Sequence, residues 1–210
     1  MKIVFSTGNS GKLREASEIL GRGFVLVSPA QMGIHEDIPE TGNTLKDNSL
    51  QKAQYIYDHC GGIDCFADDT GLEVDILGGA PGVHSARYAG ESKNFNANTD
   101  KLLKEMARRE MEASFAREMG FNTPNATRKA RFRTVVTLIL GGTKHFFEGV
   151  MNGRIAIQRA GKCGFGYDPV FIADEYPTQT VAEISEEQKN AISHRGKAMR
   201  AMADFLHSNK

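Results

Sequence analysis

The first part of the chain alternates between apolar patterns typical of strands and of a helix. Residues 2–7 (KIVFST) and 24–28 (FVLVS) are short apolar runs rich in strand-forming residues. Between them, residues 11–21 carry apolar side chains at helical spacing and end at a glycine. This order predicts a β-α-β unit, which favours a sheet with helices on its faces.

The rest of the chain continues the mixture of helices and strands. Residues 43–59 carry apolar groups on one helical face, and residues 64–77 predict a strand, a turn and a second strand. Residues 78–90 are rich in Gly and Pro and predict a loop, either ordered or flexible. Further elements are expected as a helix over 97–119, a flexible excursion at 120–129, strands at about 131–140, 143–151 and 154–157, and a helical region from a capping box at Ser185 to about His207. The prediction is a mixed α/β fold with a hairpin-rich second half.

Length and composition narrow the class of protein. The 210 residues, of which 40% are hydrophobic, suffice for one large domain or two closely joined lobes around a sizeable core. Lys plus Arg and Asp plus Glu both total 26, so the basic surplus typical of nucleic-acid binders is absent and no nucleic-acid partner is expected. Three cysteines without a CxxC pair support neither a disulfide framework nor a zinc site. With no apolar run of about 18 residues and no signal-like start, we expect a cytoplasmic protein without a membrane partner.

The segment FSTGNSGKLREA (5–16) looks at first like a nucleotide-binding P-loop. That loop needs a Gly six residues before its Lys and a Ser or Thr directly after it, whereas Lys12 has Ser6 and a leucine at these positions. A strand that ends at a helix N-terminus near Ser10 or Gly11 would still favour an anion, and Lys12 adds a point charge suited to phosphate. Ordinary turn chemistry, with Ser10 as the helix cap and Lys12 in water, explains the same residues.

Two adjacent carboxylates, Asp68 and Asp69, follow an apolar strand. On a strand their side chains would point to opposite faces, so we expect them to have different roles. One can bind Mg²⁺ or position a water molecule, since Mg²⁺ takes only one or two protein carboxylates. The alternative is that Asp-Asp-Thr-Gly is only a favourable turn. Glu40, before the helix over 43–59, could be brought to Asp69 by the fold or could remain solvated.

The segment GKCGFGYDPVF (161–171) combines glycines, aromatic rings and a carboxylate. The glycines allow a ligand to approach the backbone closely, and Phe165 and Tyr167 offer flat faces for stacking a base, worth about 1–3 kcal/mol in nucleic-acid binders. Asp168, held extended before a proline, can accept a hydrogen bond from a base N–H. A glycine-rich hairpin with core aromatics is the alternative.

His194 and Arg195 stand at a Ser and a Gly in the last helical region. Both are donors suited to an acceptor oxygen such as the 6-keto group of a purine, as Arg is to guanine O6 in DNA. A His-Arg pair on the surface of a helix is the alternative. Together, the four segments hold the groups that a nucleoside triphosphate needs: phosphate donors, metal carboxylates, a stacking ring and a keto-reading pair.

Taken together, these segments resemble the inosine triphosphate pyrophosphatase family, the XTP/dITP diphosphatases. The resemblance is carried, in order and spacing, by STGNSGK (6–12), ETGNT (40–44), FADDTGLEVDILGGAPGVHSARYAG (66–90), GFGYDPVF (164–171) and AISHRGKAM (191–199). It implies a single domain over residues 1–210, with an elongated mixed sheet flanked by helices, two lobes and a central cleft, usually in a homodimer. Residues 107–130 look long for the matching stretch of the family.

The resemblance also implies Mg²⁺-dependent hydrolysis of ITP, dITP and XTP to the monophosphate and pyrophosphate. It places the triphosphate on Thr7, Gly8, Asn9, Ser10, Gly11, Lys12 and Lys52. It places the metal on Glu40 and Asp69, with Asp69 also the proton acceptor for the attacking water, and has Asp68 and Thr70 support the turn and touch the substrate. It places the base on Phe165, Gly166, Tyr167, Asp168, Lys189, His194 and Arg195.

The same donors suggest how bases are told apart. Arg and His donors pair with O6 of hypoxanthine or xanthine, whereas adenine would leave buried donors unpaired. Rejection of guanine does not follow, because guanine shares that oxygen. Two other functions remain open: a pyrophosphatase for other modified nucleotides, for instance pyrimidines, and a nucleotide sensor without turnover.

Overall fold

The computed structural model describes residues 1–122 and 127–209, and the chain divides into two compact units. The first unit consists of Met1–Thr70, Thr134–Val150 and His194–Lys210, and the second of Gly71–Arg133 and Met151–Ser193. Within the described residues, none of the helices has the length and apolar character that crossing a bilayer requires.

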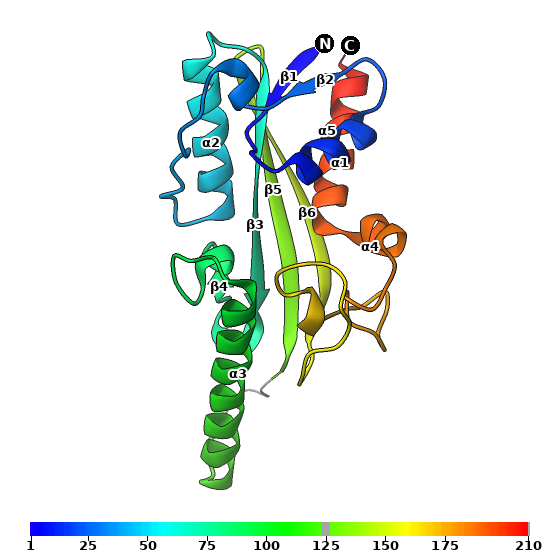
Figure 1. Cartoon of the computed structure of the whole chain (residues 1–210). Coiled ribbons are helices and arrows are strands. Elements are labelled where there is room, and N and C mark those ends of the chain that lie inside the picture. Colours follow the sequence, from blue (N-terminus) through cyan, green and yellow to red (C-terminus); the bar gives the residue numbers. More distant parts are fainter. Residues whose placement is uncertain (123–126, 210) are drawn as a thin grey trace. The chain divides into compact units, whose positions relative to one another are not determined.

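The elements follow one another along the chain as a mixture of helices and strands (Figure 1). The helices are α1 (Ser10–Leu20), α2 (Leu45–His59), α3 (Phe95–Glu118), α4 (Glu186–Ile192) and α5 (His194–Ser208). The strands are β1 (Lys2–Phe5), β2 (Val25–Val27), β3 (Cys65–Val74), β4 (Pro81–Gly82), β5 (Lys129–Leu140), β6 (Thr143–Ile155) and β7 (Phe171–Ala173). The strand order is β2-β1-β3-β5-β6-β7, with β4 paired to β3, so the predicted α/β class is confirmed.

The first unit opens with the predicted β-α-β arrangement. Strand β1 pairs in parallel with β2 and with β3, and Val4 lies opposite both Val27 and Cys65. A parallel pair needs a crossover connection, which helix α1 supplies between β1 and β2.

Both faces of the sheet in the first unit are covered by helices, and alternate side chains face different ones. The face toward α1 and α5 buries Ile3, Phe5, Phe66, Val136 and Leu138 with Ala16, Leu20, Ala198, Met199, Met202, Ala203 and Leu206. The face toward α2 buries Val4, Cys65, Ala67 and Ile139 with Ile34, Ala53 and Ile56. Because the strand period is two, neighbouring residues of β3 belong to different layers.

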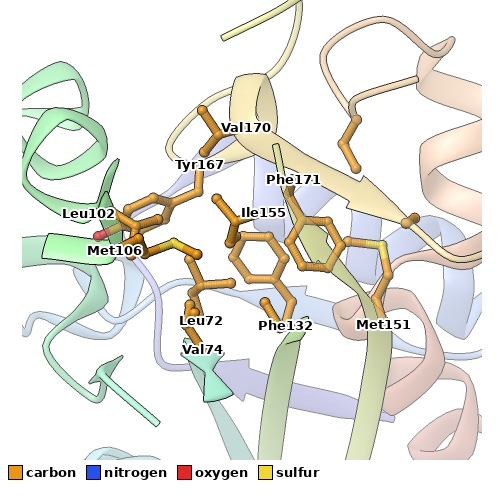
Figure 2. Packing of buried hydrophobic residues seen from close by; sticks show 13 residues of the cluster. Leu72, Val74, Leu102, Met106, Phe132, Met151, Ile155, Tyr167, Val170 and Phe171 are labelled. Carbon is orange, nitrogen blue, oxygen red and sulfur yellow. The ribbon is translucent and has the colours of Figure 1, made fainter. Parts of the chain in front are cut away.

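The second unit has its own hydrophobic core (Figure 2). Strand residues such as Leu72, Phe132 and Phe171 pack against Leu102 and Met106 of α3. The rings of Phe132 and Phe171 lie 4.8 Å apart at their centroids. All the buried residues of α3 lie in its first half; Met111 and Phe115 in its second half, and Met119 directly after it, are exposed large hydrophobic residues.

Three sequence predictions about element boundaries are wrong. Residues 64–77 contain one continuous strand, β3, rather than a strand, a turn and a strand, because β3 lies between β1 and β5 and its ladder outweighs the turn preference of Asp-Asp-Thr-Gly. The strand expected at 154–157 is not a separate element, because residues 154 and 155 are the end of β6 and residues 156 and 157 lie outside it. The last helical region is two helices, separated at Ser193, whose backbone is extended (φ −60°, ψ 140°).

The Gly- and Pro-rich stretch at 78–90 is an ordered loop. Ser85 Oγ accepts a hydrogen bond from Leu72 N (2.8 Å) and donates one to Gly82 O (2.6 Å). The side chain of Asn98 donates to Ala86 O (2.9 Å) and accepts from the backbone of residue 89 (2.6 Å). The predicted capping box at Ser185 is confirmed. Of the excursion expected at 120–129, residues 123–126 lie outside the described residues, and β5 begins at Lys129.

We expect Met106→Ala to lower the free energy of unfolding by about 2–5 kcal/mol, because Met106 is fully buried in the second core and its removal leaves a cavity. Met111→Ala is the matched control: it makes the same chemical change on the same helix at a side chain that is 66% exposed, and should change stability by less than about 0.5 kcal/mol. Guanidinium unfolding of both variants measures the difference. Equal effects would contradict the placement of α3 in this core.

Candidate active site

The first group of predicted residues lies where β1 leads into α1. Asn9 caps the helix: its side-chain oxygen accepts hydrogen bonds from Gly11 N (2.9 Å) and Lys12 N (3.2 Å). Ser10 is therefore the first helical residue, and the alternative that made Ser10 the cap is wrong. Thr7 Oγ1 accepts from Asn9 N (3.2 Å), so the turn from Thr7 to Lys12 is ordered by its own side chains. Such a helix N-terminus favours an anion.

Lys12 and Arg195 meet at the same carboxylate, that of Asp68. Lys12 Nζ donates to both oxygens of Asp68 (3.1 and 3.0 Å), and Arg195 Nε donates to Oδ2 (3.1 Å). The Asp68 side chain is only 1% exposed. Burial by itself would raise the pKa of Asp68, but the charges of Lys12, Arg195 and Lys52 outweigh it and hold this pKa well below its usual range. Asp68 is therefore an ionised, buried anchor for two cations.

Asp69 meets a different set of partners on α2. Asn48 Nδ2 donates to Asp69 Oδ2 (3.1 Å), and Lys52 Nζ lies 3.6 Å from Asp69 Oδ1 and donates to Glu40 Oε1. Burial and the nearby charge of Glu40 raise the pKa of Asp69, although Lys52 opposes this. Burial would lower the pKa of Lys52, but its carboxylate neighbours raise it. Of the two alternatives for Glu40, the structure favours proximity to Asp69, because both carboxylates contact Lys52.

The two neighbouring carboxylates thus belong to different layers of the first unit. Asp68 contacts Lys12 of α1 and Arg195 of α5, while Asp69 contacts α2. Strand alternation predicts this divergence, because Asp68 shares its face with Phe66, and Asp69 shares its face with Ala67. The predicted divergence of the two side chains to opposite faces is confirmed. Thr70, on the Asp68 side of the alternation, forms a 2.7 Å hydrogen bond with Thr134.

Sequence reasoning missed Asn48. This residue is 2% exposed and joins two parts of the site, since its Oδ1 accepts from Gly42 N (2.7 Å) while its Nδ2 holds Asp69. Residue 42 can lie this close to α2 because it is a glycine: a Cβ there would lie 2.6 Å from Asp47 Cβ. A signal was present: Asn48 falls three residues after Leu45, on the buried face of the helix. A polar side chain on that face needs a buried partner.

In the second unit, Phe165 is presented with charged neighbours. Phe165 is 58% exposed, Lys189 Nζ lies 4.6 Å from its ring centroid, and Phe95 contributes a second ring at 6.2 Å. Asp168 Oδ2 accepts from Lys189 Nζ (2.5 Å) and from Phe165 N (2.8 Å). Gly164 is required here, because its φ is +79° and a Cβ would lie 2.2 Å from Asp168 Oδ2.

Tyr167 does not present its ring beside that of Phe165. It is 5% exposed, lies in the second core (Figure 2), and donates its hydroxyl to Ser85 O (2.9 Å). The core-aromatic alternative therefore holds for Tyr167, and Phe165 is the exposed ring of the segment. Gly166 O accepts from Thr99 Oγ1 (3.3 Å). His194 is the first residue of α5, directly after the break at Ser193.

The donor set suits a hard divalent cation that shares its shell with a ligand. Among the residues that the structure describes, no three His, Cys, Asp or Glu residues are grouped as a metal cage. Glu40 and Asp69 nevertheless both approach one cation, the ammonium of Lys52. Mg²⁺ is commonly held by one or two carboxylates, with phosphate oxygens and water completing the shell, and these two residues fit that requirement.

The chain is similar to known proteins over nearly its whole length. The Ham1 family matches residues 3–205. The dITP/XTP pyrophosphatase of Porphyromonas gingivalis is 47% identical over 98% of this chain and 97% of its own, and that of Flavobacterium psychrophilum is 44% identical over 98% and 99%. A solved HAM1 protein from Coxiella burnetii superimposes with a TM-score of 0.88 at 32% identity, covering 99% of each chain.

We expect Asn48→Ala to lower the free energy of unfolding by about 1–3 kcal/mol, because Gly42 N–H and the carboxylate of Asp69 each lose a buried partner. The control is Asn43→Ala, the same change at an exposed residue just before α2. Guanidinium unfolding curves of the two variants measure the difference. An Asn48 variant as stable as the Asn43 variant would show that this side chain does not hold the two segments together.

Proposed function

The chain belongs to the Ham1 family, and from that premise we propose that it hydrolyses non-standard purine nucleoside triphosphates (ITP, dITP and XTP) to the monophosphate and pyrophosphate. Relatives that are 44% and 47% identical over almost the whole chain are dITP/XTP pyrophosphatases. The observation that carries the proposal is the position of a half-buried carboxylate, Asp69, beside Lys52, whose ammonium also contacts Glu40. Such a group can hold a metal-bound phosphate and accept a proton.

The triphosphate is proposed to bind at the N-terminus of α1. Backbone N–H groups and the helix dipole there favour an anion, and the residues concerned are Thr7, Gly8, Asn9, Ser10 and Gly11. Because Asn9 uses its side-chain oxygen to cap the helix, its amide NH₂ is the group suited to a phosphate oxygen. The ammonium groups of Lys12 and Lys52 supply positive charge, and Thr70 is proposed to contact the substrate from β3.

A divalent cation, proposed to be Mg²⁺, would be held by Glu40 and Asp69. When bound, it would neutralise charge on the phosphate oxygens. The contacts of Lys52 support this assignment. Its ammonium pairs with both Glu40 and Asp69, so these two carboxylates lie close enough to contact one cation. The site requires phosphate and water to complete the metal shell, so metal and substrate are expected to bind together.

Asp69 is proposed as the proton acceptor. A water oxygen forms a bond to the α phosphorus, the bond from that phosphorus to the bridging oxygen breaks, and pyrophosphate leaves with the bridging oxygen. The proton of the water passes to Asp69, which acts as the general base of this step. Asn48 holds one oxygen of Asp69 and so orients the carboxylate.

The base is proposed to stack on Phe165, the exposed ring of its segment. Lys189 and Asp168 lie beside this ring and offer a donor and an acceptor, while Gly166 and Tyr167 shape the backbone around it. His194 and Arg195 are proposed to donate to the 6-keto oxygen. Adenine would leave these donors unpaired, a mismatch that lowers the rate by about 100-fold or more. A homodimer, from the resemblance, and a cytoplasmic location are also proposed.

The test of the function is pyrophosphate release from ITP, XTP, dITP, GTP, ATP and dTTP, each with and without Mg²⁺. We expect fast Mg²⁺-dependent release from ITP, XTP and dITP and slow release from ATP and dTTP. Release mainly from dTTP would refute the purine assignment, and binding of ITP without release would indicate a sensor. Activity that is unchanged by chelation would remove the metal role of Glu40 and Asp69.

Asp69→Asn tests the assignment of the proton acceptor. The variant should lose turnover by about 10²- to 10⁴-fold, the range expected for loss of a general base, while nucleotide binding stays measurable by calorimetry. Asp58→Asn makes the same chemical change at an exposed residue of α2 and should retain full activity. Normal hydrolysis by Asp69→Asn would exclude this role for Asp69.

A further inference from the structure

Asp68 lies outside the metal and proton chemistry proposed above, yet it is the most deeply buried carboxylate of the site. Its side chain is 1% exposed, whereas that of Asp69 is 14% exposed. A buried carboxylate is costly unless cations and hydrogen bonds compensate for lost water. Two cations do so here, and they come from two different helices, Lys12 from α1 and Arg195 from α5.

The geometry of these contacts leaves specific groups for a ligand. Lys12 directs its ammonium to both oxygens of Asp68 at 3.0 and 3.1 Å. Arg195 uses Nε, at 3.1 Å from Oδ2, so the fork of its two η nitrogens is not required for this bond. Within the part of the chain that the structure describes, the other ion pair of Arg195 is longer, with Nη1 3.9 Å from Glu15 Oε2. An arginine held by Nε keeps its planar donor pair for a second acceptor.

We infer that Asp68 is a positioning residue that couples phosphate binding at Lys12 to base reading at Arg195. This inference rests on the proposed function, in which Lys12 binds the triphosphate and Arg195 reads the 6-keto oxygen. Because one carboxylate holds both side chains, a base that displaces Arg195 also disturbs Lys12. A base without the 6-keto oxygen therefore weakens phosphate binding at Lys12 as well as base binding at Arg195.

The alternative is that Asp68 only stabilises the fold. The two roles differ in what they do to substrate preference. A purely structural loss lowers the activity on every nucleotide by the same factor. Loss of the coupling lowers the ratio of kcat/KM for ITP to that for ATP, and this ratio does not depend on the fraction of enzyme that is folded.

The experiment measures that ratio in a double-mutant cycle: wild type, Asp68→Asn, Arg195→Ala and the double variant. We expect Asp68→Asn to lower the ITP-to-ATP ratio by about tenfold and to have no further effect on the ratio in the Arg195→Ala background, since interacting residues are not additive. Equal losses on ITP and ATP, or full additivity of the two changes, would overturn the inference.

Asp68→Glu provides the rescue, because it keeps the charge and displaces it by one methylene. Its ITP-to-ATP ratio should lie well above that of Asp68→Asn even if kcat falls. A ratio as low as that of Asp68→Asn would overturn the inference that the negative charge at position 68 couples Lys12 to Arg195. A wild-type enzyme without preference for ITP would refute the proposed function itself, and so the two failures are distinguishable.

Discussion

Adjacent side chains of a β-strand point to opposite faces of the sheet, and the site depends on this constraint at Asp68 and Asp69. Helices cover both faces of the sheet in the first unit, so each carboxylate is turned into a packed layer. Each must then find positive or hydrogen-bonding partners there. Asp68 finds them on α1 and α5, and Asp69 finds them on α2.

The opposite pKa shifts of the two aspartates follow from these surroundings. Both are desolvated, but Asp68 has two cations in direct contact, whereas Asp69 has one lysine that it shares with Glu40. Neighbouring carboxylates whose environments separate their pKa values are suited to different tasks. Asp68, the carboxylate with the lowered pKa, serves as a permanent anion between two cations.

In the second unit, the main feature of the candidate site is an exposed aromatic ring, that of Phe165. Phe165 stays at the surface because Asp168 accepts from its backbone N–H and from Lys189, whose ammonium covers the ring. Tyr167, two residues later, is buried in the core and turns its hydroxyl to Ser85. Gly164 permits the turn, since any side chain there would collide with Asp168. One short segment therefore supplies both a core residue and a candidate ligand surface.

Local hydrophobic period and motif spacing were enough to predict the β-α-β opening, the positions of most helices, the family and the divergence of Asp68 from Asp69. The three-dimensional fold set three features that local patterns did not predict: β3 continues through the predicted turn, the last helical region breaks at Ser193, and Phe165 rather than Tyr167 is exposed. It also decided that Lys12 and Arg195 share Asp68, and that Asn48 holds Asp69. These outcomes depend on contacts between residues 21 to 127 positions apart, which no local pattern encodes.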